Sequence, residues 1–344
     1  MTGAARIGIS GWRYGPWRGT FYPEDLPQAR ELAHASRQLD TIEINGSFYS
    51  LQTPQSYGAW RDATPPGFVF AVKGGRFITH IKRLRDCTAP LANFFASGVL
   101  ALQDKLGPVL WQLPPFFRFD AKVIGDFLAQ LPRTTSEAAQ LGKRHDARLN
   151  KDRAYLEVDA ERPLRHTMEV RHDSFIDPSF VKLLRKYNVA MCVADNARNW
   201  PVLEDVTADF VYCRLHGHTQ MYASGYSAPA LDRWAERVEA WRQGEQAPGA
   251  ELAAPELAPK KRTARDVYVY FDNDAKIRAP YDAINLAARL HGRPRVPFPR
   301  AFRDRGEEPR NDPRFWRRGG PAQKPMLGRS TKSRSSSSSR SEPV

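Results

Sequence analysis

FVYCRLH at residues 210–216 is a short, mostly apolar run that ends in an arginine and a histidine. An amphipathic stretch follows it at residues 228–243, and a second apolar run, DVYVYF, follows at residues 266–271. Short runs of this kind, separated by helical stretches, are typical of βα units whose strands lie parallel in one sheet. The predicted fold class is therefore α/β.

The same alternation extends toward the N-terminus and predicts eight strands. They lie at residues 6–10, 41–45, 68–73, 108–112, 166–171, 190–195, 210–216 and 266–271. Amphipathic helices are predicted between most of them, at residues 27–38, 120–130, 178–187, 228–243 and 280–291. A doubly wound open sheet is the alternative, but eight similar units with no GxGxxG after any strand favour closure. We predict a single (β/α)8 TIM-like barrel.

Composition divides the chain into a barrel at residues 1–302 and a tail at residues 303–344. Two polar segments interrupt the barrel: residues 134–163, predicted to be an insertion packed on or beside it, and residues 244–261, predicted to be a flexible loop. The tail has 11 Lys and Arg against 5 Asp and Glu, and is rich in Gly, Pro, Arg and Ser. It lacks the apolar residues that would offset its ordering entropy, so a disordered basic C-terminal tail is predicted.

The formal net charge of +14 is concentrated partly in this tail. Arginines interleaved with serines can contact the phosphates of RNA or DNA without a fold of their own. A solubilising extension with no partner is the alternative interpretation, because a charge run alone is weak evidence of binding.

Cysteine usage and hydropathy predict a cytoplasmic protein. Cys87, Cys192 and Cys213 are far apart and form no CxxC motif, so we expect buried small hydrophobic side chains in a reducing compartment. The N-terminus reaches the first strand without an apolar signal segment. No later run approaches the roughly 18 apolar residues of a membrane helix, so no membrane partner is expected.

Side-chain alternation places polar residues inside the predicted barrel, since successive residues of a strand face the lumen and the helices in turn. In the strand at residues 41–45, Ile42 and Ile44 should face the helices, which turns Glu43 toward the lumen. The polar residues that this argument places in the lumen, all at the C-terminal ends of their strands, are Ser10, Glu43, Asn45, Lys73, Gln112, Glu169, Arg171, Asp195, Arg214 and His216.

This convergence indicates a functional site, because active sites of such barrels lie at the C-terminal end of the strands. Several charged groups from different strands cannot be desolvated cheaply unless they pair with each other, with water or with a ligand. The alternative is a self-satisfied ion network, in which the glutamates neutralise the lysine and arginines.

Loop residues after the strands are expected to form the rim of this site. Aromatic side chains beside cations can stack on a base or a sugar face while the cations contact phosphate. Ordinary packing over the barrel mouth is the alternative for about half of them. The rim residues predicted to bind substrate are Trp12, Tyr14, Tyr49, Arg76, His80 and His172. With them we group the lumen residues Asn45, Lys73, Gln112, Arg171, Asp195 and Arg214.

The candidate catalytic residues are Glu43, Glu169 and His216. Two carboxylates on different strands can serve as general acid and base, which suits a hydrolase or lyase acting on a phosphate-containing substrate. The glutamates could instead ligate a divalent metal with Asp195 and His216, but no metal-binding motif supports this. No nucleotide-cofactor motif is present either, so the cofactor is left unassigned.

Six sequence blocks resemble the YecE-like family, catalogued as domain of unknown function family 72. They are GISGWRYGPWRGTFYP (8–23), EINGSFY (43–49), FAVKGGRFITH (70–80), EVRHDSF (169–175), RLHG (214–217) and YFDND (270–274). The resemblance spans nearly all of residues 6–299 and implies a TIM barrel whose family has no established activity. Residues 134–163 and the tail depart from the family's compact core.

Two classes of function fit these observations. One is an enzyme acting on an anionic, phosphate-bearing or nucleotide-like small molecule. The other is a non-catalytic nucleic-acid-binding protein that uses the basic pocket and the tail to hold RNA or DNA. An open pocket of unpaired charges would favour the enzyme, and inert charge pairs in a dry lumen would favour the binding protein.

Overall fold

The fold is that of a computed structural model, which describes residues 2–149, 153–217, 222, 224–274 and 277–297. The tail predicted at residues 303–344 lies outside the described residues. None of the described helices is long and apolar enough to span a membrane.

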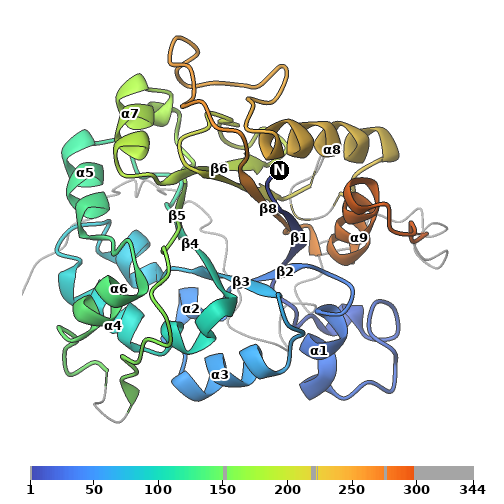
Figure 1. Ribbon diagram of the computed structural model, residues 1–344, viewed down its shortest axis with the longest axis horizontal. Helices are drawn as coiled ribbons and strands as arrows, with labels where there is room; N and C mark the ends of the chain where they lie inside the picture. The colour runs from blue at the N-terminus through green and yellow to red at the C-terminus, as the bar shows by residue number, and fades with distance from the viewer. Residues whose placement is uncertain (1, 150–152, 218–221, 223, 275–276, 298–344) are drawn as a thin grey trace, which may run out of the picture. The chain divides into compact units, whose positions relative to one another are not determined.

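Eight parallel strands close into a barrel in chain order, which confirms the predicted fold class (Figure 1). Each strand lies within a few residues of its predicted bounds. The strands are β1 (Ala5–Ser10), β2 (Thr41–Ile44), β3 (Val69–Lys73), β4 (Leu106–Gln112), β5 (His166–Glu169), β6 (Ala190–Asp195), β7 (Phe210–Leu215) and β8 (Asp266–Phe271).

Helices surround the barrel on its outer side (Figure 1). The α-helices are α1 (Glu31–Ala35), α2 (Gly46–Tyr49), α3 (Pro54–Asp62), α4 (Thr88–Ala96), α5 (Ala121–Gln130), α6 (Thr135–Gly142), α7 (Pro178–Lys186), α8 (Ala228–Arg242) and α9 (Arg278–His291). Short 3₁₀ segments lie at Gly15–Trp17, Gln28–Arg30, Val99–Lys105 and Asp173–Phe175, and a π-helical turn at Phe77–Ile81. The helix predicted at 27–38 is therefore a 3₁₀ turn followed by the short α1.

Capping residues explain where the outer helices begin. Asp120 accepts hydrogen bonds from two backbone amides at the start of α5, Asp177 caps α7, and Ser227 caps α8. These side chains satisfy amides that have no partner within the first turn. Proline occupies the first turn of α7 and α8, where its missing amide costs nothing.

The strands separate two apolar regions according to side-chain alternation. Residues such as Ile42, Met168 and Leu215 pack outward against the helices in the large core. The lumen holds a smaller cluster, including Ala71, Leu110 and the tyrosines of β7 and β8. These apolar side chains fill the part of the lumen away from the C-terminal ends of the strands. The polar side chains therefore lie at the C-terminal ends.

The described part of the predicted insertion, residues 134–149 and 153–163, packs against the barrel's outer helices, where α6 contacts α4. The Tyr155 amide donates to the Ala96 carbonyl at 2.8 Å, and a bridge between Thr134 and Pro163 closes the segment. Residues 244–261 are held by hydrogen bonds such as that from the Ala253 amide to Asp205 Oδ2 at 2.7 Å.

The three cysteines are free and buried, as predicted for small hydrophobic side chains.

Candidate functional site

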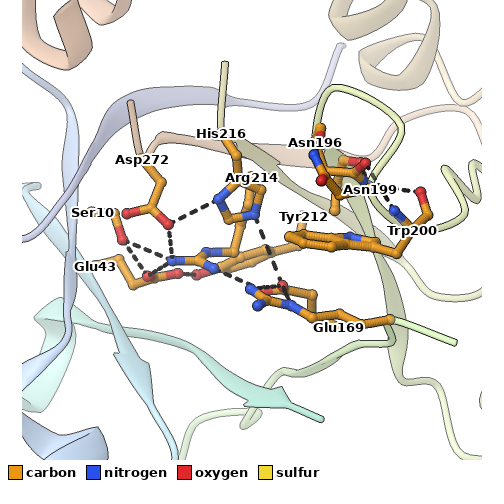
Figure 2. Close-up of polar contacts among 12 residues, drawn as sticks. Ser10, Glu43, Glu169, Asn196, Asn199, Trp200, Tyr212, Arg214, His216 and Asp272 are labelled. Carbon is orange, nitrogen blue, oxygen red and sulfur yellow. Dashed lines mark hydrogen bonds and ion pairs between the residues drawn. The ribbon is translucent and has the colours of Figure 1, made fainter. Parts of the chain in front are cut away.

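Arg214, on β7, lies at the centre of the polar residues at the barrel's C-terminal end (Figure 2). Its side chain is 1% exposed. Nη1 donates to Glu169 Oε2 at 2.8 Å, and Nη2 lies 2.9 Å from both Glu43 Oε1 and Asp272 Oδ2. Nη2 also donates to Ser10 Oγ at 3.0 Å. One guanidinium therefore joins carboxylates from three different parts of the barrel, with charge-assisted bonds of the strong kind.

Glu43 is held from two further sides. The Ser10 hydroxyl donates to its Oε1 at 2.6 Å, because the β1–β2 register sets these two residues opposite each other. The Tyr212 hydroxyl donates to Oε2 at 2.5 Å. Asn45 donates to Ser10 Oγ at 2.9 Å and so extends the network toward the mouth. Both oxygens of this fully buried carboxylate are thus satisfied by protein donors.

Glu169, on β5, pairs with a second guanidinium. Arg171 Nε donates to Glu169 Oε1 at 2.7 Å, and Arg171 Nη2 lies 2.6 Å from the same oxygen. The Arg171 guanidinium also lies over the Trp200 ring, 4.2 Å from its centroid. Burial alone would raise the pKa of Glu169, but Arg171 and Arg214 hold it well below its ordinary value. Glu169 is therefore ionised at neutral pH.

His216 lies between two carboxylates. Its Nδ1 is 2.9 Å from Asp272 Oδ2, and its Nε2 is 3.8 Å from Glu169 Oε1. Trp200 and Tyr222 pack edge-on against the imidazole. Burial lowers the pKa of His216 although Asp272 opposes that effect, so the ring is neutral at pH 7. We call Ser10, Glu43, Glu169, Arg171, Arg214, His216 and Asp272 the Arg214 network.

Two aspartates that follow β8 have opposite protonation tendencies. Burial would raise the pKa of Asp272, but the neighbouring Arg214 keeps it well below its ordinary value. Burial and the Asp272 charge raise the pKa of Asp274 well above its ordinary value. Asp274 lies within hydrogen-bonding reach of the Tyr14 hydroxyl, which itself donates to the Ser10 carbonyl at 2.5 Å.

Lys73, at the end of β3, differs from the cations of the Arg214 network. It is 8% exposed, and its Nζ lies over the Phe48 ring, 4.5 Å from the centroid. Among the described residues its ammonium makes no hydrogen bond or ion pair. Burial and the nearby Arg214 charge lower the pKa of Lys73 to about 8. Burial and the Lys73 charge in turn lower the pKa of His80 to about 4.

The remaining predicted residues divide between the lumen, the rim and structural positions. Gln112 is buried in the lumen, opposite Glu169 in the β4–β5 register. Tyr49, 48% exposed, and the exposed Arg76 lie on the rim.

Trp12 and His172 have structural contacts instead. Trp12 is buried against Trp60, and the Tyr22 hydroxyl bonds its carbonyl. His172 caps the 3₁₀ turn Asp173–Phe175 by accepting from the Ser174 amide. That either residue contacts a ligand stays a prediction.

The predicted lumen position of Asp195 is wrong. Asp195 pairs with Leu215 in the β6–β7 register, and paired residues of parallel strands share a face. Leu215 packs in the outer core, and Ala194 pairs with lumen-facing Arg214. Asp195 therefore faces the helices, where it lines a hollow of about 810 Å³ with residues of α8, including Trp234. The metal-ligand set suggested for Glu43, Glu169, Asp195 and His216 is consequently not assembled.

Four residues of the site are absent from the predicted binding and catalytic residues: Asp272, Asp274, Tyr212 and Trp200. Alternation could have found Asp272, because Tyr268 and Tyr270 face the lumen and the next residue of that parity is Asp272. No periodic signal marks Trp200, which lies in a loop after β6.

In the portion of the chain described, no group of three or more His, Cys, Asp or Glu side chains is placed to hold a metal ion. The carboxylates of the Arg214 network are instead bound by Arg, Ser and Tyr donors.

These features define the class: a (β/α)8 barrel with a charged cluster at the C-terminal ends of its strands. The model of the family described as "Protein of unknown function DUF72" matches residues 6–303. The chain belongs to this family, which confirms the resemblance drawn from its sequence blocks.

Known relatives agree with this assignment. The UPF0759 protein YunF of Bacillus subtilis (strain 168) is 28% identical over 116 residues, 32% of this chain and 40% of YunF. The aligned part thus spans well under two thirds of that relative.

Two solved structures of DUF72 family proteins support the fold. TM1631 of Thermotoga maritima MSB8 superposes with a TM-score of 0.60 at 22% identity, covering 83% of this chain and 99% of that one. EF0366 of Enterococcus faecalis V583 gives a TM-score of 0.58 at 15% identity, covering 86% and 98%.

Proposed function

We propose that this protein is an enzyme acting on an anionic, phosphate-bearing or nucleotide-like small molecule at the C-terminal end of the barrel. The observation that carries the proposal is Lys73. Lys73 is 8% exposed and no described residue gives its ammonium a hydrogen bond or ion pair, so a bound anion would supply the protein-side partner that it lacks. Arg171 and the exposed Arg76 lie near enough to affect the same His80 and can contribute to anion binding.

The Arg214 network forms the floor of the proposed site and fixes its charges. Both Nη atoms of Arg214 are bound by protein carboxylates. We therefore expect Lys73, and not Arg214, to make the main contact with a substrate anion. Glu43 and Glu169 are likewise paired with protein donors, as the alternative of a self-satisfied ion network expects, which leaves them poorly suited to exchange protons with a substrate. The case for an enzyme therefore rests on Lys73 and not on these paired charges. With two arginines against three carboxylates and a neutral histidine, this floor supplies no net positive charge, so the attraction for an anion has to come from Lys73 and the rim arginines.

Proton transfer is better assigned to Asp274 and His216. Neighbouring titratable groups whose pKa values are driven apart by their environment are typical of acid–base sites. Asp274, held protonated, can act as general acid, and neutral His216, oriented by Asp272, can act as general base. This arrangement suits a hydrolase or a lyase. A cytoplasmic location remains part of the proposal, in keeping with the three free cysteines.

A binding experiment with two matched lysine variants tests the proposal. Calorimetric titration with inorganic phosphate, mononucleotides and sugar phosphates should give a ligand whose affinity falls at least tenfold in Lys73→Met, the scale expected for losing one charge-assisted contact. Consumption of the bound compound, followed by phosphorus NMR, should stop in Asp274→Asn.

Lys105→Met is the control, because Lys105 is also 8% exposed. Its Nζ donates to the carbonyls of Arg61 and Thr64 at 2.6 and 2.7 Å, so its role is structural. Lys105→Met should keep ligand affinity. Binding of oligonucleotides without binding or turnover of any small anion would favour the non-catalytic alternative.

A further inference from the structure

Exposed large apolar side chains gather on one part of the barrel's C-terminal rim. In the described ranges they are Tyr49, Phe77, Ile81, Phe116 and Ile176, between 39% and 58% exposed. All five follow β2, β3, β4 or β5, which are consecutive neighbours in the closed barrel. A grouping of this kind on adjacent loops marks an interaction surface, whereas singly scattered apolar residues do not.

Side-chain contacts join these four loops into one continuous arc. Phe48, after β2, packs edge-on against His80, after β3, with ring centroids 5.1 Å apart. Arg83, after β3, lies over the Phe116 ring, after β4, at 5.1 Å. The Phe119 amide, after β4, donates to Ser174 Oγ, after β5, at 2.8 Å. We call the loops that follow β2 to β5 the loop arc.

The loop arc is also basic. Arg76, Arg83, Arg85 and Arg118 are exposed on it, and Arg148, from the segment after α6, lies 4.9 Å from the Phe77 ring centroid. Four aspartates lie on the same loops and neutralise part of this charge: Asp86, 3.5 Å from Lys82, Asp120, 3.6 Å from Arg85, and Asp173 and Asp177. The two exposed phenyl rings therefore each carry an arginine against them.

We propose that the loop arc binds single-stranded RNA or DNA. Its combination of aromatic rings and arginines is the one that single strands use, since unpaired bases stack on rings while cations track the phosphates. A duplex hides its base faces and could use only the arginines. The proposal goes beyond the proposed enzyme activity, because such a surface can hold a strand whether or not Lys73 binds a small anion.

Fluorescence anisotropy of the full chain with labelled oligothymidylate and oligouridylate of roughly 20 nucleotides tests this surface. Phe77→Ala and Phe116→Ala should each weaken single-strand binding by about tenfold, the scale of one lost base stack. Binding to a duplex of the same length should change little, because the basic tail and the arginines remain. Both rings are partly exposed and each holds one arginine, so each variant should lower the thermal unfolding midpoint only slightly.

Ile81→Ala with Ile176→Ala is the matched control, since isoleucine adds apolar area to the loop arc but cannot stack on a base. This pair should leave single-strand affinity within about twofold of the wild type. Equal loss in the phenylalanine and isoleucine variants would overturn the proposal in favour of a general apolar contact with protein or lipid. No loss in the phenylalanine variants would also overturn it, whereas phosphate binding that depends on Lys73 tests the proposed enzyme separately.

Discussion

Arg214→Met is expected to lower the free energy of unfolding by about 3–5 kcal/mol at neutral pH, the cost of leaving buried charges without their partner. The variant keeps an unbranched apolar stem but removes the cation that Glu43, Glu169 and Asp272 share. Urea denaturation followed by circular dichroism measures the effect.

The size of this loss should depend on pH. The pKa values of Glu169 and Asp272 are lowered in the folded protein, so their stabilisation is complete above their unfolded values near 4 and is lost as pH falls through the lower folded values. Without Arg214 these pKa values rise, and the carboxyl groups become protonated at a higher pH. The difference between wild type and Arg214→Met should therefore shrink below about pH 5.

Arg198→Met supplies the control for Arg214→Met. Arg198 pairs with Glu251 at 3.2 Å, but the two side chains are 82% and 50% exposed. An exposed pair of this kind contributes about 0–1 kcal/mol, so this variant should unfold almost as the wild type does. If the two arginine variants lost equal stability, the buried ion pairs of the Arg214 network would contribute no more to folding than an exposed pair does.

Side-chain alternation predicted the lumen correctly where a strand has apolar residues on one face only. In β2, Ile42 and Ile44 mark the side that faces the helices. In β7, Val211, Cys213 and Leu215 do the same. The charged residues between them must therefore face the lumen. The closed barrel follows from the same local patterns, because each βα unit contributes one strand in chain order.

Strand β6 shows where this reasoning fails. Its residues 190–194 are apolar at every position, so alternation carries no information about which face is the lumen. The alternation argument therefore places Asp195 on the wrong face. Asp272 lies one residue beyond the end of β8, outside the predicted strand, although its side chain continues the lumen-facing series.

The chemistry of the site depends on contacts that no local pattern encodes. The pKa of Asp274 is raised because folding removes it partly from water beside the charged Asp272, and Trp200 reaches Arg171 from a loop without periodic signal. From the sequence one can predict which types of residue form the site and that they lie at the C-terminal ends of the strands. The sequence could not show that both Nη atoms of Arg214 are bound by carboxylates while the Lys73 ammonium has no such partner among the described residues.

Lys73→Met is expected to raise the free energy of unfolding at pH 7, by up to about 3 kcal/mol, which is the energy equivalent of the pKa shift. The folded pKa of Lys73, about 8, lies below its unfolded value, so the charged form is disfavoured in the folded state. Loss of its contact with the Phe48 ring should offset roughly 1 kcal/mol of the gain.

The sign of this effect gives a second test through pH. Below pH 8 the wild type carries the full cost of burying a charged Lys73. Between pH 8 and about 10.4 the unfolded state binds more protons than the folded state, so wild-type stability rises with pH. Lys73→Met should therefore lose its advantage above about pH 10, as measured by urea midpoints at pH 7, 9 and 10.

Lys105→Met should behave in the opposite way, because it removes hydrogen bonds to buried carbonyls and leaves them unsatisfied. The contrast distinguishes Lys105, which stabilises the fold, from Lys73, which lowers stability. Binding groups commonly lower the stability of the protein that carries them. If Lys73→Met proved as destabilising as Lys105→Met at pH 7, the ammonium would be an integral charge of the Arg214 network. The argument for an anion at this position would then fail, whatever the loop arc binds.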